Sequence, residues 1–132
     1  MYMRRALELA RRAQQDGEVP IGAIVTLKSE IIGEGWNRPI AANDPTAHAE
    51  IQAIRSASSA KGNYRLTGAT LYVTLEPCEM CIGAMFHARI ARVVYGAKDP
   101  KKIILKNQTK IEGGVLAEEC GRILSAFFAA KR

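Results

Sequence analysis

Apolar and polar positions alternate along the chain at two different periods, and the change between them predicts a mixture of helices and strands. Near the N-terminus, apolar side chains fall three or four residues apart with arginines between them, which predicts an amphipathic helix ending at Asp16 and Gly17. The apolar run at residues 21–27 predicts a buried strand, and a short turn leads to a second strand at residues 30–35. The chain therefore begins as a helix followed by a β-hairpin.

The rest of the chain shows helical and strand patterns in turn. After the hairpin, the predicted elements are a helix from Asp44 to about Ala57, a strand at residues 69–74, a helix opening at Pro77, a strand at residues 92–96, a short strand or extended link at residues 111–116, and an amphipathic helix from Leu116 to Phe127. We therefore expect one domain, residues 1–132, with a three-layer α/β/α architecture around a mixed sheet of about five strands.

Composition narrows the class of protein. A chain of 132 residues and 14.4 kDa can bury a core without disulfides, and its three cysteines imply no disulfide framework, which fits a reducing cytoplasm. No apolar run approaches the roughly 20 residues that a membrane span needs. The 19 basic residues outnumber the 13 acidic ones, giving a net charge of +6. That surplus suits a polyanionic partner, although a basic protein without such a partner has the same composition.

One histidine, one glutamate and two cysteines have the spacing of a catalytic zinc site. His48 and Glu50 are two residues apart, and Cys78 and Cys81 follow in the segment PCEMC at residues 77–81. Three protein ligands leave the fourth position of a tetrahedral zinc open to water, whereas structural sites close all four positions. A carboxylate two residues from the histidine can move protons for that water. This arrangement suits hydrolytic deamination.

Both halves of the motif are predicted at helix N-termini. Asp44 and the proline after it are typical of a helix start, which places His48 in the first turn. A proline also opens the second helix, and three helical residues are about 300° of rotation, so Cys78 and Cys81 face one side. The partial positive charge of a helix N-terminus favours the thiolates that zinc requires.

A structural or redox site is the alternative for these cysteines, because Cys-x-x-Cys also occurs in both. A closed zinc site needs a fourth ligand, and only His87 and Cys120 remain among the histidines and cysteines. His87 lies about 240° around the helix from Cys81 and about 9 Å further along it, too far to share the metal. Cys120 falls on the apolar stripe of the last helix, where a thiol is normally a packing residue. The pattern favours a catalytic zinc.

Several segments resemble the tRNA-specific adenosine deaminases. They are GEVPIGA at residues 17–23, WNRP at 36–39, PTAHAE at 45–50, TLYVTLEPC at 70–78, GAM at 83–85, HARI at 87–90 and VVYGAKD at 93–99. The resemblance implies a cytidine-deaminase-like fold, zinc on His48, Cys78 and Cys81, and Glu50 as the proton carrier. It also implies the conversion of adenosine to inosine at the wobble position of tRNA, in a cytoplasmic homodimer.

The same resemblance suggests which residues contact substrate. Asn37 and the Ala49 backbone N–H would hydrogen-bond the base, Ile21 and Leu75 would wall its pocket, and Lys98, Asp99 and Lys101 would lie beside the nucleic acid. Plain core packing is the alternative for Ile21 and Leu75, and a solvated loop is the alternative for the lysines. The basic run extends through Lys102, Lys106 and Lys110, and a C-terminal group of Phe127, Phe128, Lys131 and Arg132 also matches a family helix that borders RNA.

One segment departs from the family pattern. Members usually have a longer stretch where this chain has only residues 100–112. The shortening bears on RNA binding and subunit contacts, and one alternative is a trimmed variant that acts on other single-stranded nucleic acid. Two further alternatives to a tRNA deaminase remain. One is a deaminase of a free base or nucleoside such as cytosine, guanine or cytidine. The other is a zinc-stabilised RNA-binding module without activity, for which Glu50 would have no use.

Overall fold

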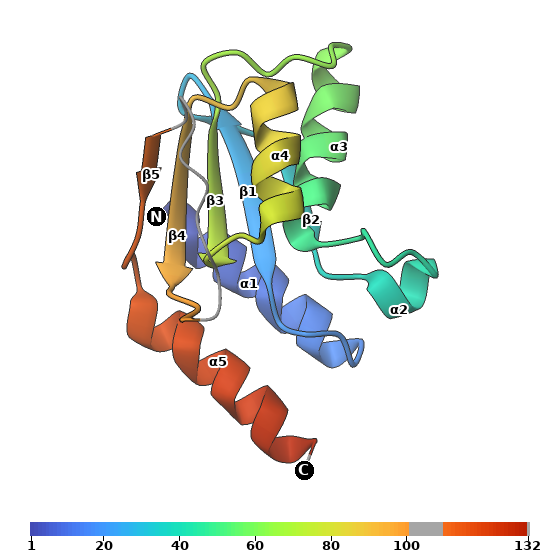
Figure 1. The fold of residues 1–132 in the computed structure, drawn as a ribbon, viewed down its shortest axis with the longest axis vertical. Helices are drawn as coiled ribbons and strands as arrows, with labels where there is room; N and C mark the ends of the chain where they lie inside the picture. The colour runs from blue at the N-terminus through green and yellow to red at the C-terminus, as the bar shows by residue number, and fades with distance from the viewer. Residues whose placement is uncertain (101–109, 132) are drawn as a thin grey trace.

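A computed structural model describes residues 1–100 and 110–131, and its helices and strands follow the predicted order (Figure 1). The elements are α1 (Tyr2–Gln15), β1 (Gly22–Leu27), β2 (Glu30–Trp36), α2 (Pro39–Ala42), α3 (Ala49–Lys61), β3 (Thr70–Leu75), α4 (Glu79–Ala88), β4 (Arg92–Ala97), β5 (Lys110–Glu112) and α5 (Ala117–Ala130). No helix within the described residues is long and apolar enough to cross a membrane.

The five strands form one mixed sheet in the order β2-β1-β3-β4-β5. β1 pairs antiparallel with β2 on one side and with β3 on the other. β3, β4 and β5 run parallel to one another, with α4 crossing between β3 and β4. The predicted mixed sheet of five strands is therefore confirmed, with the hairpin at one edge.

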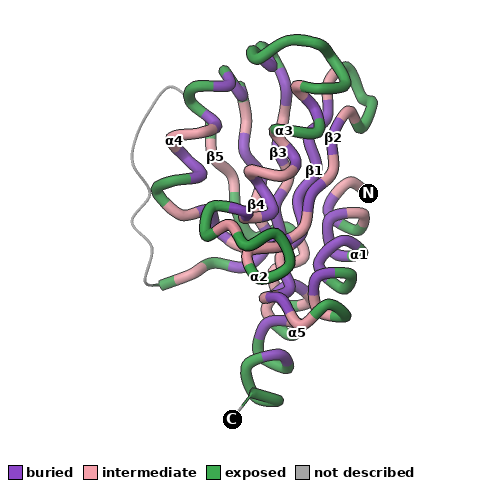
Figure 2. The backbone as a smooth tube through the Cα atoms, turned by 90° about the vertical axis from the view of Figure 1, so that its right-hand side faces the viewer, coloured by how far each residue is buried: buried purple, intermediate pink, exposed green. Residues whose placement is uncertain are grey.

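Helices cover both faces of the sheet and enclose two apolar clusters, so the predicted α/β/α layering is confirmed (Figures 1 and 2). Side chains from α3 and α4 meet β1, β3 and β4 on one face, with fully buried Ala53, Leu71 and Val93 among them. On the other face, α1 and α5 contribute Leu7 and Cys120 to the second cluster. In Figure 2 the strands are mostly buried, whereas the end of α5 is largely exposed.

The predicted start of the helix that contains Glu50, α3, is wrong by several residues. Asp44 does not begin α3, because its Oδ1 accepts hydrogen bonds from the Thr46 N–H at 2.9 Å and the Thr46 hydroxyl at 2.7 Å. Such a turn offers the same capping side chain a local alternative to a helix. α3 instead begins at Ala49, with His48 as its N-cap, and it continues to Lys61 rather than to Ala57.

The other differences are one additional short helix and the boundaries of three elements. The short helix α2 was not predicted, and α4 begins at Glu79, with Cys78 rather than Pro77 at its start. The short strand β5 is Lys110–Glu112 instead of residues 111–116, and α5 begins at Ala117. Shifts of one or two residues are typical of helix and strand ends, whereas β5 ends four residues earlier than predicted.

Glycines allow two helices to pack unusually close to the sheet. A Cβ on Gly35 of β2 would clash with the backbone of Ala49 and Ala53, so only glycine lets α3 approach there. A Cβ on Gly96 of β4 would clash with the Cys120 sulfur of α5. The first contact fixes the start of α3 against the sheet. The second accounts for Cys120 as a packing residue.

Candidate metal and catalytic site

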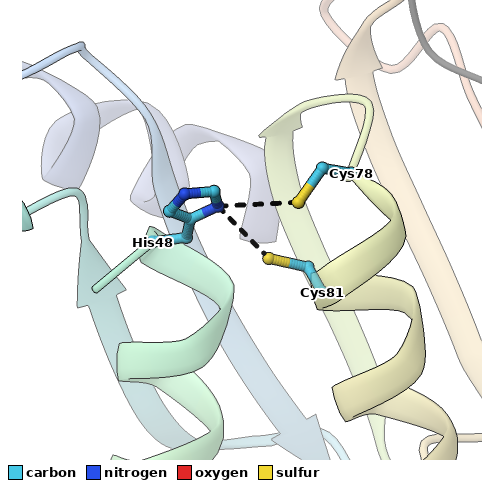
Figure 3. Close-up of side chains that lie close together, drawn as sticks. All are labelled: His48, Cys78 and Cys81. Carbon is cyan, nitrogen blue, oxygen red and sulfur yellow. Dashed lines mark hydrogen bonds between the residues drawn. The ribbon is translucent and has the colours of Figure 1, made fainter. Parts of the chain in front are cut away.

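The starts of α3 and α4 bring three metal-ligating side chains together (Figure 3). His48 Nδ1 lies 3.6 Å from Cys78 Sγ and 3.5 Å from Cys81 Sγ, and all three ligand atoms lie within 4.8 Å of one another. A tetrahedral zinc with Zn–S near 2.3 Å and Zn–N near 2.05 Å places sulfur and nitrogen about 3.6 Å apart. The donor set and its spacing therefore fit zinc, with the histidine binding through Nδ1.

Helix-cap geometry explains why these side chains are available. His48 has φ −70° and ψ 154°, and Cys78 has φ −79° and ψ 171°, the extended conformation of an N-cap residue. Neither side chain makes a capping hydrogen bond to its own helix. Both therefore project from their helix starts toward each other. Cys81 lies in the first turn of α4 and completes the group.

The two thiols share their protons unequally. Hydrogen bonds from the Cys81 thiol and from His48 lower the pKa of Cys78 to about 3. The Cys78 hydrogen bond, then burial, and then the nearby Glu50 carboxylate raise the pKa of Cys81. The pair thus favours the thiolate form at Cys78 and the protonated form at Cys81. Because zinc binds thiolates, metal binding would displace that proton from Cys81.

Glu50 lies beside the metal group without belonging to it. It is in the first turn of α3 and only 4% exposed, and its carboxylate acts on the Cys81 thiol through charge and a hydrogen bond. Among the described residues, only His48, Cys78 and Cys81 form a group of metal-ligating atoms. The site thus combines three ligands with a buried carboxylate. His48 and Cys78 are partly exposed, whereas Cys81 and Glu50 are buried.

The other two candidate ligands lie elsewhere. Cys120 is fully buried against Gly96, and the exposed His87 lies in the last turn of α4. Neither belongs to the group formed by His48 and the two other cysteines. Their placement supports the packing interpretation of Cys120 and the exclusion of His87 as a ligand.

Asn37 and Ala49 contact each other. The Ala49 N–H donates to Asn37 Oδ1 at 2.8 Å, and Asn37 is 6% exposed. Asn37 therefore caps the first turn of α3, where the chain passes from His48 into Glu50. Its Nδ2 group has no hydrogen-bond partner among the described residues and stays available as a donor. The predicted contacts of both groups with a base stay predictions.

The remaining substrate candidates differ in position. Ile21 packs partly against the cluster under α3 and α4, whereas Leu75 packs against the cluster under α1 and α5.

The candidates for RNA contact follow the end of β4 in the sequence. Lys98 is exposed, and the Asp99 N–H donates to a Glu76 carboxylate oxygen at 2.9 Å. Lys101, Lys102, Lys106 and Arg132 lie outside the described residues. Lys110 is exposed and pairs with Glu112 at 3.6 Å; Phe127 is 9% exposed and Phe128 48%.

Two buried carboxylates near the site were missed by sequence reasoning. Glu18 is 2% exposed and accepts from the backbone N–H groups of Ile40 at 3.2 Å and Ala41 at 2.8 Å. Glu76 is 1% exposed and holds the Asp99 backbone. Glu76 ends an apolar run directly before Pro77, and Glu18 precedes an apolar run that starts at Val19, and those placements were the available signal.

Comparison with known proteins gives a consistent result. Residues 1–97 match the family described as the cytidine and deoxycytidylate deaminase zinc-binding region. The tRNA-specific adenosine deaminase of Buchnera aphidicola subsp. Schizaphis graminum is 50% identical over 142 aligned positions, which cover 99% of this chain and 94% of that protein. Because this chain has 132 residues, that relative has residues that this chain lacks.

Two solved structures extend the comparison. One comes from studies of A-to-I editing by tRNA:A34 deaminases at the wobble position, with a TM-score of 0.89 and 43% identity over 93% of this chain and 98% of that chain. The other is a guanine deaminase from Bacillus subtilis, with a TM-score of 0.70 and 33% identity over 98% of this chain and 91% of that chain. The predicted cytidine-deaminase-like fold is confirmed by the first of these likenesses.

Proposed function

The chain belongs to the zinc-binding cytidine and deoxycytidylate deaminase family, among the tRNA-specific adenosine deaminases, and from this premise we propose that it converts adenosine to inosine at the wobble position of a tRNA. The single observation that carries the proposal is the group of His48, Cys78 and Cys81 at tetrahedral zinc distances beside a buried Glu50. A structural zinc site would have no need of that carboxylate.

The ligand set determines what the site can do. His48 Nδ1, Cys78 Sγ and Cys81 Sγ would hold zinc and leave one position to the solvent side. A zinc ion held by three side chains lowers the pKa of its water to roughly 7. The two sulfurs come from the N-terminal turn of α4, whose partial positive charge favours thiolates.

Glu50 would move the protons of the reaction. Its carboxylate would take a proton from the attacking water and deliver it to the ring nitrogen N1 of adenine as the C6–O bond forms. It would then take the remaining proton of the new C6 hydroxyl and pass it to the amine, so that the C6–N bond breaks, ammonia leaves and the C6 carbonyl of inosine forms. One group can serve twice because each transfer reverses its protonation state. Its burial at 4% exposure keeps bulk water from competing for the proton. Acid–base help of this kind accelerates a reaction by about 10²–10⁴-fold.

The RNA partner is supported by charge as well as by the relatives. A net charge of +6 favours a polyanion, and it has no evident use in binding a neutral free base. The proposed contacts of the RNA are Lys98, Asp99 and Lys101. The proposed contacts of the base are Asn37, Ala49, Ile21 and Leu75. A cytoplasmic homodimer of single-domain subunits stays our prediction, and light scattering of the purified protein would test the dimer.

The likeness to a guanine deaminase favours a second candidate, the hydrolysis of a free base. One experiment separates the two. Zinc-loaded protein is incubated with an anticodon stem-loop carrying adenosine at the wobble position, and in parallel with adenosine, cytidine, cytosine and guanine. Inosine formed in the stem-loop alone supports the proposal. Turnover of a free base or nucleoside assigns the protein to the small-molecule deaminases. Zinc binding without any turnover favours the RNA-binding module.

A further inference from the structure

A basic groove lies along the free edge of the sheet, next to the catalytic site. It has a volume of about 310 Å³ and runs between β2 and α3. Its lining includes Glu34, Trp36, Arg38, Gln52, Arg55 and Ser56, and we call it the β2 groove. β2 is an edge strand, so one side of its backbone has no strand to pair with in the described sheet.

The β2 groove carries positive charge that no ion pair within the described chain neutralises. Arg38 and Arg55 line it, and neither makes an ion pair with any described residue, although Arg55 lies near enough to Asp44 for its charge to add to the turn hydrogen bonds that lower the pKa of that exposed carboxylate. Arg12 lies over the Trp36 ring at 4.3 Å from its centroid, and Arg38 lies at 5.8 Å. The indole Nε1 is buried without a partner among the described residues, so packing and the two guanidinium groups hold the ring.

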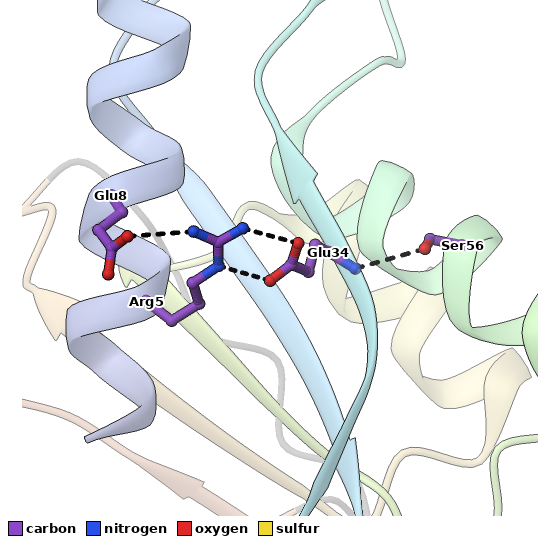
Figure 4. A network of polar contacts seen from close by, with 4 residues as sticks. All are labelled: Arg5, Glu8, Glu34 and Ser56. Carbon is purple, nitrogen blue, oxygen red and sulfur yellow. Dashed lines mark hydrogen bonds and ion pairs between the residues drawn. The ribbon is translucent and has the colours of Figure 1, made fainter.

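The one carboxylate in the groove is already occupied (Figure 4). Glu34 accepts two hydrogen bonds from Arg5, at 2.6 and 2.9 Å, on the α1 side. The same two bonds hold the pKa of Glu34 below its ordinary value, so it stays ionised and paired. The groove is thus left with two guanidinium groups that no carboxylate of its own lining pairs with.

Backbone donors add to these cations. The Glu34 N–H points away from β1 and donates to the Ser56 hydroxyl at 3.4 Å. Residues two apart on a strand direct their N–H groups to the same side, so the Trp36 N–H also points out of the sheet. The Gly22 N–H opposite Trp36 turns to Thr74, as expected for a pair that is not hydrogen-bonded. Because the Glu34 N–H is taken by Ser56, the Trp36 N–H is the backbone donor left beside the guanidinium groups, and such donors match the oxygens of a phosphate.

The groove adjoins the metal site. Asn37, between Trp36 and Arg38, bonds to Ala49, and the Gln52 N–H donates to the His48 carbonyl at 3.0 Å. We propose that the β2 groove binds a backbone phosphate of the RNA strand whose adenosine enters the site, an assignment that rests on the function proposed above. The unpaired charge favours this occupant over a peptide strand added to the edge of β2.

The experiment compares wild-type protein with Arg55→Gln and with Arg38→Gln/Arg55→Gln. Lys61→Gln is the matched control, since Lys61 is exposed in the last turn of the same helix. Affinity for the anticodon stem-loop is measured across salt concentrations, together with kcat and KM for inosine formation. We expect KM to rise about two- to fivefold for each arginine removed, as for exposed charge pairs, with kcat retained. The slope of log affinity against log salt should fall by about 0.7 for each phosphate that the variant no longer neutralises.

Each other outcome counts against the groove assignment. If wild-type protein edits the stem-loop and both arginine variants match the Lys61→Gln control, the proposal is wrong while the proposed function stands. A change of oligomeric state with unchanged RNA affinity would instead assign the edge to a protein partner. If inorganic phosphate competes with RNA equally for wild type and double variant, the groove does not bind the backbone. No editing by the wild type refutes the function itself.

Discussion

Replacing Glu50 by glutamine tests whether this carboxylate moves the protons of the proposed deamination. The glutamine keeps the shape of the side chain, but its amide cannot accept a proton from water and pass it on to the substrate. Glu50 is 4% exposed, and the glutamine has nearly the same volume, so we expect the protein to stay folded. We expect kcat to fall by about 10²–10⁴-fold, equivalent to about 2.7–5.4 kcal/mol of barrier.

Three measurements on the same preparation show what causes the loss of turnover in Glu50→Gln. Single-turnover inosine formation reports the chemical step, elemental analysis reports zinc content, and thermal unfolding reports the fold. Glu79→Gln is the matched control, because Glu79 is an exposed glutamate in the first turn of α4. It should keep wild-type turnover and zinc. The comparison separates removal of a glutamate near a helix start from removal of the proton carrier.

Two results would refute the reasoning about Glu50. Turnover within tenfold of wild type, with zinc retained, would mean that another group moves the proton. Loss of zinc along with turnover would mean that the Glu50 carboxylate helps to hold the metal, contrary to a group made of His48, Cys78 and Cys81.

Three further predictions follow from the contacts. Cys81→Ser should abolish zinc binding and turnover, measured by elemental analysis and inosine formation, since it removes one of three ligands. Asn37→Ala should lower the free energy of unfolding by about 1 kcal/mol in chemical denaturation, because the Ala49 N–H loses its cap. The Arg5 hydrogen bonds lower the pKa of Glu34, so the stability they give is present above the unfolded-state pKa and lost as pH falls through the folded-state value. Glu34→Gln should therefore cost about 0.5–1 kcal/mol at neutral pH. In acid titrations of stability the difference from wild type should begin to shrink near the ordinary glutamate pKa of about 4.3 and vanish only once the pH lies below the lowered folded-state pKa of Glu34.

The sequence allowed most of the site to be predicted because the signals were local. His48 and Glu50, and Cys78 and Cys81, are close pairs whose spacing already encodes a shared face. The order of helices and strands followed from apolar periods, which packing against a sheet reinforces. Local pattern also placed Cys120 in the core, where it packs against Gly96 of β4.

Other features depended on contacts between distant segments. Asp44 has the residue type of a helix cap, but its side chain closes a turn with Thr46, and α3 begins later at Ala49. Asn37, which lies in a different loop, caps that helix instead by accepting the Ala49 N–H. The burial of Glu18 depends on the backbone of α2, a helix too short to show a period. No spacing within the sequence identifies such partners.

The same tertiary contacts explain how a short chain can hold three ligands at fixed distances. The start of α3 is pressed against β2 through Gly35 and capped by Asn37, which fixes His48. The start of α4 is anchored by buried Cys81 and by Ile82 in the core beneath it. Since both helices are held by apolar packing, the position of the ligands does not depend on the metal as it does in a zinc finger. Removing zinc with a chelator should therefore stop turnover while leaving the helical content of the protein largely intact.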